Sequence, residues 1–221
     1  MKQILKQPLY IGLMTGIAVL YVAFLSLDIF ILTSRSNLSL QLKYAAMVLC
    51  FLLALSLYGQ SSNKKDSKFV VIALIFTLIA DIFLLFTNYD FAGVFFFCLV
   101  QLTYLKRYNS RFFAFGLALT PIALLVYFLT SISALFIIAG LYAALILSCF
   151  VSTFHTLLPE FNRKCVRWGM VLFILCDIHV ALFNRIPRNI AYFQVAAVAM
   201  WLFYLPSQLL LALSAHHMMG E

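Results

Sequence analysis

Two aspartates are the residues most able to do chemistry, because each interrupts a long apolar stretch. Asp81 lies in FTLIADIFLLF (residues 76–86) and Asp177 lies in LFILCDIHVALF (residues 172–183). An Asp near the centre of a membrane helix costs about 2.5–3.5 kcal/mol on insertion scales, so we expect both to face the protein interior. One carboxylic acid can donate a proton while a second carboxylate stabilises a cation or activates water. The alternative is that each Asp is neutral, or bonded to a neighbouring hydroxyl or amide, and serves packing.

Two other stretches each present an amide and a phenol or indole on one helical face, at the spacing i, i+4, i+7 and i+11. These faces are Phe97, Gln101, Tyr104 and Tyr108, and Ala197, Trp201, Tyr204 and Gln208. Amides and phenols both donate and accept hydrogen bonds, so the faces are candidate substrate-binding surfaces. The alternative is ordinary polar contact between helices. Counting residues from the helix ends places Tyr204 and Gln208 about 12–18 Å deeper than Asp177, so direct contact with Asp177 is not expected.

The elements that must position these residues are membrane-spanning helices. Hydrophobic residues make up 65% of the 221-residue chain and charged residues 10%, whereas a soluble domain is about half apolar and a quarter charged. A bilayer core takes about 20 apolar residues per helix. Eight stretches reach or nearly reach this length, the fourth and seventh being short: Leu9–Leu27, Leu42–Tyr58, Phe69–Thr87, Phe91–Leu105, Phe112–Leu129, Leu135–Leu157, Trp168–Phe183 and Ile190–Ser214. We therefore expect an all-α, polytopic bundle of eight transmembrane helices, in a single domain covering residues 1–221.

The positive charges predict how this bundle is oriented. With eight helices, eleven of the fifteen Lys and Arg residues fall on the side that carries both termini, and the other side receives Arg35, Lys43, Arg185 and Arg188. This bias predicts that both termini are cytoplasmic, in a multi-pass protein of the plasma membrane of a bacterium. Helix orientation explains the net charge of +8, so the sequence calls for no nucleic-acid partner.

The remaining sequence features bear on packing and on cofactors. Asp81 and Asp177 are 96 residues apart, close to four helix-plus-loop units, so a parallel duplication of four plus four helices is one interpretation. Gly12 and Gly16 form G-x-x-x-G, which favours close helix approach and leaves a homodimer open. Neither the cysteine nor the histidine spacing fits a metal site, so no metal and no cofactor is expected.

Several short motifs resemble the YhhN or lysoplasmalogenase family of polytopic membrane proteins. They are Lys43-Tyr44, Ala80-Asp81 with Phe83-Leu84-Leu85, the face ending in Tyr104, Cys176-Asp177 with Ala181-Leu182-Phe183, and Phe203-Tyr204-Leu205-Pro206-Ser207-Gln208. The chain departs from the family pattern in two ways. Ala80 and Cys176 precede the aspartates where the family usually has Gly or Ser, and Gln101 stands where it usually has His.

The resemblance implies hydrolysis of the vinyl-ether bond of lysoplasmalogens, with a lysophospholipid-like substrate drawn from the membrane lipids. It implies Asp81 and Asp177 as catalytic residues. It implies a substrate-binding role for Gln101, Tyr104, Tyr204, Gln208 and Lys43. Two alternatives stay open: a non-enzymatic lipid-binding or transport protein that uses the same interior, and a small membrane scaffold with two buried neutral aspartates.

Overall fold

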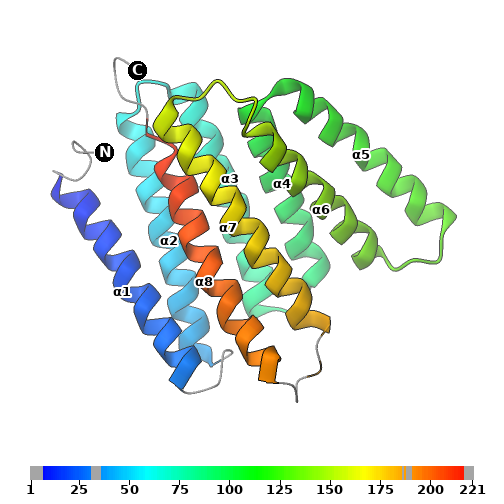
Figure 1. Cartoon of the computed structure of the whole chain (residues 1–221), viewed down its shortest axis with the longest axis horizontal. Coiled ribbons are helices and arrows are strands. Elements are labelled where there is room, and N and C mark those ends of the chain that lie inside the picture. The colour runs from blue at the N-terminus through cyan, green and yellow to red at the C-terminus, as the bar shows by residue number, and fades with distance from the viewer. Residues whose placement is uncertain (1–6, 31–35, 186, 188–190, 217–221) are drawn as a thin grey trace.

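The computed structural model describes residues 7–30, 36–185, 187 and 191–216, which form eight helices and no strand (Figure 1). The helices are α1 (Pro8–Phe30), α2 (Asn37–Gln60), α3 (Lys64–Phe86), α4 (Asp90–Tyr108), α5 (Ser110–Leu129), α6 (Ala134–Ser152), α7 (Glu160–Arg185) and α8 (Ala191–Leu213). The predicted all-α bundle of eight helices is confirmed. Seven of these helices are long and apolar enough to cross a membrane, and α4 is the exception.

The exception reflects how much of α4 is turned toward other helices. The helix has Asp90 in its first turn and Lys106 and Arg107 in its last, which lowers its average apolarity. Gln101 and Tyr104 lie fully buried in its middle. The helix packs along α3, α5 and α6, so much of its surface contacts protein. A polar face toward protein is therefore the reason that its composition falls short of an ordinary span.

The sixth and seventh helices differ from their expected limits. The sixth was expected to reach Leu157, but α6 ends at Ser152, where the Thr153 N–H bonds the carbonyls of Cys149 and Phe150. The seventh was expected from Trp168, but α7 begins at Glu160, directly after Pro159. The Pro159 carbonyl accepts the first hydrogen bond of this helix, from the Arg163 N–H at 2.8 Å. Hydropathy alone misses such polar first turns.

Both ends of the described chain lie at the same end of the bundle (Figure 1). The α2–α3, α4–α5 and α6–α7 connections lie at that end too. A cytoplasmic location of this end stays a prediction. The outlying helix is α5, which packs only on α4 and α6 and buries only Gly116 among its residues. A Cβ on Gly116 would come within 2.8 Å of a Leu105 methyl group, so glycine permits the close approach of α5 to α4.

The neighbours of each helix recur between the two halves of the chain. Helix α4 packs on α5 and α6, and α8 packs on α1 and α2, as a cyclic four-plus-four arrangement requires. The sequential pairs of the first half also recur in the second. The pair α3 and α8 has no equally close counterpart among the described residues. The duplication itself stays a prediction, which this neighbour pattern supports.

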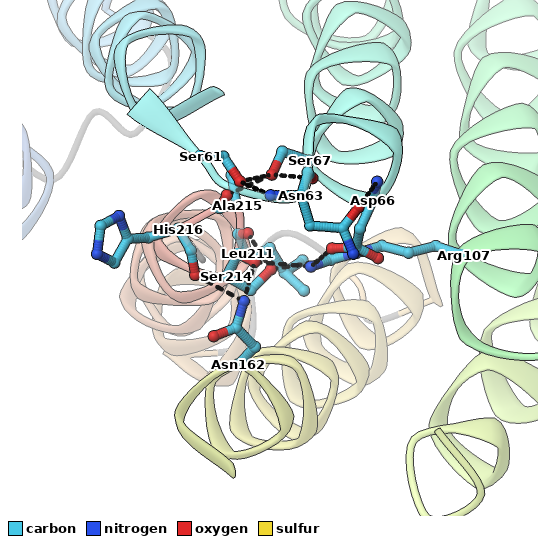
Figure 2. Close-up of polar contacts among 10 residues, drawn as sticks. All are labelled: Ser61, Asn63, Asp66, Ser67, Arg107, Asn162, Leu211, Ser214, Ala215 and His216. Carbon is cyan, nitrogen blue, oxygen red and sulfur yellow. Dashed lines mark hydrogen bonds and ion pairs between the residues drawn. The ribbon is translucent and has the colours of Figure 1, made fainter. Parts of the chain in front are cut away.

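A hydrogen-bonded group of polar residues closes one end of the bundle (Figure 2). We call it the end cluster: Asp66, Ser67, Arg107, Asn162 and Ser214. Arg107 Nη2 donates to Asp66 Oδ2 at 2.7 Å and to the Ser214 carbonyl at 2.6 Å. Asn162 Nδ2 donates to the same carbonyl at 2.8 Å, and Ser67 Oγ donates to the Ala215 carbonyl at 2.6 Å. These bonds fasten the end of α8 to α3, α4 and α7.

Candidate active site

Asp81 occupies a buried position on α3, with an exposed fraction of 4%. Its Oδ1 accepts a hydrogen bond of 2.8 Å from the Tyr204 hydroxyl on α8. Its Oδ2 has no hydrogen-bond partner. A carboxylate that receives one fixed phenolic donor is held in place, and its second oxygen remains free to bind another group.

Asp177 on α7 is half-buried and is held in a similar way. Its Oδ2 accepts a hydrogen bond of 2.7 Å from the Tyr142 hydroxyl on α6. The sequence did not lead us to expect a direct contact between Asp177 and Tyr204. The Tyr204 hydroxyl bonds Asp81 instead.

The two carboxyl–phenol pairs converge on one aromatic ring. The Phe97 ring centroid lies 5.9 Å from that of Tyr142 and 6.4 Å from that of Tyr204. The Phe173 ring, on α7, lies with its centroid 5.8 Å from those of both Phe97 and Tyr204. Four helices, α3, α6, α7 and α8, therefore bring the two carboxyl groups into one region beside α4.

Within the described residues, no cation neutralises either carboxyl group. The ion pairs within the described residues are Lys43 with Asp28, Arg107 with Asp66, and Lys164 with Glu160. Buried charges in proteins are usually paired, so two interior carboxyl groups without a cation call for another explanation. Acid–base chemistry supplies one, because it needs a carboxyl group able to gain and lose a proton. In the described part of the chain, no three His, Cys, Asp or Glu side chains are placed to hold a metal ion.

The four predicted amide and phenol residues lie in or next to this region. Gln101 is fully buried, and its side-chain amide lies beside the Tyr142 hydroxyl without a hydrogen bond of ordinary geometry. Tyr104 lies one turn further along α4, stacked on Tyr108 at 5.7 Å. Gln208 lies one turn beyond Tyr204 on α8 and is fully buried. The structure therefore joins Tyr204 directly to a carboxylate and places Gln101 beside the other pair.

Lys43, the remaining predicted binding residue, is engaged within the chain. Its Nζ lies 2.6 Å from Asp28 Oδ2, and its side chain is 1% exposed. The ammonium group also lies 5.1 Å from the centre of the Trp201 ring, within the range of a cation–π interaction. Trp201 in turn contacts Tyr204 edge-on, with ring centroids 5.2 Å apart. Lys43 thus supports the Asp81 region through Trp201 and does not face it as a free cation.

Two residues of the region were missed in the sequence. Tyr142 is the one tyrosine in the sixth apolar stretch, and no amide or second phenol follows it at helical spacing to mark a polar face. Asp28 was overlooked because the first span was ended at Leu27, whereas α1 continues to Phe30. A search for every hydroxyl or carboxyl group within three residues of a span would have found both.

Comparison with known proteins gives one match. A comparison with curated proteins found no similar protein, and no solved structure is similar either. A model of the YhhN family, however, matches residues 38–215. The match includes Asp81, Asp177 and the tyrosines that bond them, and it covers most of the chain. This polytopic helical protein therefore belongs to the YhhN family.

Proposed function

We propose that this protein is an intramembrane hydrolase that cleaves the vinyl-ether bond of lysoplasmalogen-type lipids. The observation that carries the proposal is the pair of interior carboxyl groups, Asp81 and Asp177. Each accepts a hydrogen bond from a tyrosine, and neither belongs to an ion pair among the described residues. Membership of the YhhN family supports a membrane protein of this kind, and the sequence resemblance supports the substrate.

The chemistry needs one protonated and one ionised carboxyl group. The acid donates its proton to the alkene carbon distant from the ether oxygen, and the adjacent carbon becomes an oxocarbenium ion. The carboxylate stabilises this cation and removes a proton from the water that attacks it. The resulting hemiacetal collapses to a fatty aldehyde and the glycerophospho-alcohol. One water is consumed, and one carbon–oxygen bond is broken.

The tyrosines fit this scheme as positioning residues. The Tyr204 hydroxyl donates to Asp81 and the Tyr142 hydroxyl to Asp177, so each carboxyl group is fixed through one oxygen. The other oxygen of Asp81 has no partner and is available for proton transfer. Fixing a catalytic group before the substrate arrives lowers the entropic cost of reaching the transition state.

The test is aldehyde release from a lysoplasmalogen by the purified protein in liposomes. Asp81→Asn and Asp177→Asn should each lower the rate by about 10²–10⁴-fold, the usual contribution of a general acid or base. Asn retains the volume and can still hydrogen-bond, but it cannot transfer a carboxylic proton. Asp90→Asn is the matched control, because Asp90 is exposed at the start of α4, and its rate should stay unchanged.

Two further readouts identify the reaction. In D₂O the aldehyde should carry one deuterium on the carbon next to the carbonyl, since that carbon takes the proton from the acid. A lysolipid with a saturated ether should not be cleaved, because it has no alkene to protonate. Wild-type turnover in both Asn variants would contradict the two-carboxyl mechanism.

A lipid-binding or transport protein is the second candidate, and the recurring neighbour pattern of the two helix halves favours it. Transporters often consist of repeats with acidic residues near the membrane midplane. This function is supported if the wild-type protein binds single-chain lipids but releases no aldehyde. Asp81→Asn should then change binding or flux and leave no chemical product in either protein.

A further inference from the structure

Five buried polar side chains lie between α4 and α8 with polar atoms that find no partner among the described residues. We call them the amide layer: Gln101, Tyr104 and Tyr108 on α4, and Ser207 and Gln208 on α8. Four of them are 0% exposed and Tyr108 is 4% exposed. Both amide atoms of each Gln, both phenolic oxygens and the Ser207 hydroxyl lack a hydrogen-bond partner. Leaving such buried groups unsatisfied is unfavourable, so a ligand is expected.

The register of the two helices places the two amides at the same level. Both helices run in the same direction (Figure 1). Phe97 contacts Tyr204, and Arg107 bonds Ser214, so the facing positions differ by 107 residues in both cases. The same offset sets Gln101 opposite Gln208, between these two contacts. Each amide also lies one helical turn from the ring contact of Phe97 with Tyr204, because Gln101 follows Phe97 and Gln208 follows Tyr204 by four positions.

The chemistry of the amide layer fits a small neutral ligand that both donates and accepts hydrogen bonds. Its amides, phenols and hydroxyl carry no formal charge. Arg107, the cation beside the Tyr108 ring, is already bonded to Asp66 and Ser214. A phosphate group would therefore meet no free positive charge there. Water matches these requirements, because buried waters typically make about three hydrogen bonds to otherwise unsatisfied polar groups.

The amide layer also adjoins both carboxyl–phenol pairs. Gln101 lies beside the Tyr142 hydroxyl, which bonds Asp177. Gln208 lies one turn from Tyr204, which bonds Asp81. We propose that the amide layer is a built-in hydration site that holds water between α4 and α8 and delivers it to the two carboxyl groups. The delivery role rests on the proposed hydrolase function, whereas the hydration site does not.

The hydration site is tested by X-ray hydroxyl-radical footprinting of the intact protein in detergent, since bound water converted to radicals labels the side chains beside it. Tyr104 and Tyr108 should be labelled several-fold more than Tyr10. Tyr10 is the matched control, because it is a tyrosine with an exposed fraction of 1% whose hydroxyl lies 3.4 Å from the Ser56 carbonyl. Labelling of all three tyrosines at the same low level would overturn the proposal.

Variants sharpen the same measurement. Gln101→Leu and Gln208→Leu remove amide groups at nearly constant volume, so labelling of Tyr104 should fall toward that of Tyr10. Gln60→Leu is the control, because Gln60 is exposed at the end of α2 and bonds Gln7. Labelling of Tyr104 that is unchanged in both layer variants would show that these amides hold no water.

Kinetics tests the delivery role. Gln101→Leu and Gln208→Leu should lower kcat about tenfold while KM stays constant, because water is a reactant and not part of lipid binding. A raised KM at constant kcat would overturn delivery and assign the amides to the lipid itself. If the wild-type protein releases no aldehyde, the hydrolase function fails, and the footprinting still decides the hydration site.

Discussion

The end cluster and the amide layer are both buried and polar, but they differ in how their hydrogen bonds are satisfied. In the end cluster, Arg107 bonds Asp66 and Ser214, and Asn162 bonds two carbonyls (Figure 2). In the amide layer, Gln101 and Gln208 make no side-chain hydrogen bond. Both groups include residues of α4, and the end cluster also draws residues from α3 and α7.

The difference separates groups that serve the fold from groups that await a ligand. A polar network that is completed within the chain fixes one arrangement of the helices. A polar group left open in an apolar interior costs free energy, unless water or a substrate completes it. Asp28 with Lys43 belongs to the first kind, and Asp81 with its unpartnered oxygen belongs to the second. Substitutions should therefore affect stability in one set and activity in the other.

The largest expected effect on stability is that of Arg107→Leu. Removing one partner of a buried ion pair typically costs about 3–5 kcal/mol, because the other charge is left uncompensated. Here the side chain of Arg107 is fully buried and that of Asp66 is 11% exposed, and the bonds to Ser214 are lost as well. The free energy of unfolding, measured by SDS titration in mixed micelles, should fall by this amount.

The control for Arg107→Leu is Arg111→Leu, since Arg111 is exposed at the start of α5. Its unfolding free energy should change by less than about 0.5 kcal/mol. The fraction of Arg107→Leu protein that remains folded should keep its turnover per molecule. A loss of turnover without a loss of stability would show that Arg107 serves activity, and it would contradict the assignment of the end cluster to the fold.

Lys43→Met should destabilise the protein by a smaller amount, about 3 kcal/mol, the lower end of the range for a broken buried pair. Met fills the volume of the lysine stem, and Asp28 keeps its 2.6 Å hydrogen bond from Ser39. The double variant Lys43→Met with Asp28→Asn should recover most of the loss, because no charge is then left unpaired. Unfolding in mixed micelles measures both variants. If the double variant is no more stable than the single one, the charge of Lys43 is not what stabilises the protein.

Much of this architecture is predictable from the sequence, and the reason is the membrane. Eight apolar stretches predict eight helices, and the cost of a charge in lipid predicts that Asp81 and Asp177 turn inward. The pairing of Tyr142 with Asp177 is not predictable in this way. It depends on which helices lie side by side, and helix packing in membranes follows shape and small residues more than hydropathy.

Helix register was the second limit. Counting residues from each helix end assumes that all ends are level, and it predicted only that Tyr204 would not contact Asp177. The structure sets Tyr204 against Asp81 and Phe97. The ion pair of Asp28 with Lys43 shows a third limit of prediction from sequence. Each helix contributes only one residue to such a pair, so neither helix shows a repeating pattern of polar residues that would predict it.

Tyr204→Phe and Tyr142→Phe should each lower kcat/KM by about tenfold to a hundredfold. A hydrogen bond to a charged group is worth about 1.5–3 kcal/mol, and about 1.4 kcal/mol corresponds to a factor of ten. Phe keeps the ring contacts with Phe97 and removes only the hydroxyl that positions the carboxyl group. Aldehyde release by the purified variants measures the effect.

The matched control for these tyrosines is Tyr10→Phe. It removes a tyrosine hydroxyl that bonds the Ser56 carbonyl. Tyr10 and Ser56 lie on α1 and α2, whereas the two carboxyl groups lie on α3 and α7. Its kcat/KM should remain within about twofold of the wild type. An equal loss in all three variants would mean that the tyrosines act through stability and not through the carboxyl groups.

The smallest expected effect is a gain, from Gln101→His. Gln101 lies beside the Tyr142 hydroxyl that bonds Asp177, at the position where the family resemblance places a His. An imidazole can gain and lose a proton, which an amide cannot. We expect kcat/KM to stay equal or to rise by less than tenfold, with a pH dependence that the wild-type protein lacks. The pH profile of aldehyde release, recorded beside Gln208→His as the same change on the facing helix, measures this. Only the α4 variant should gain the new titration. If Gln101→His loses more than tenfold while remaining folded, the amide has a role of its own that an imidazole cannot replace.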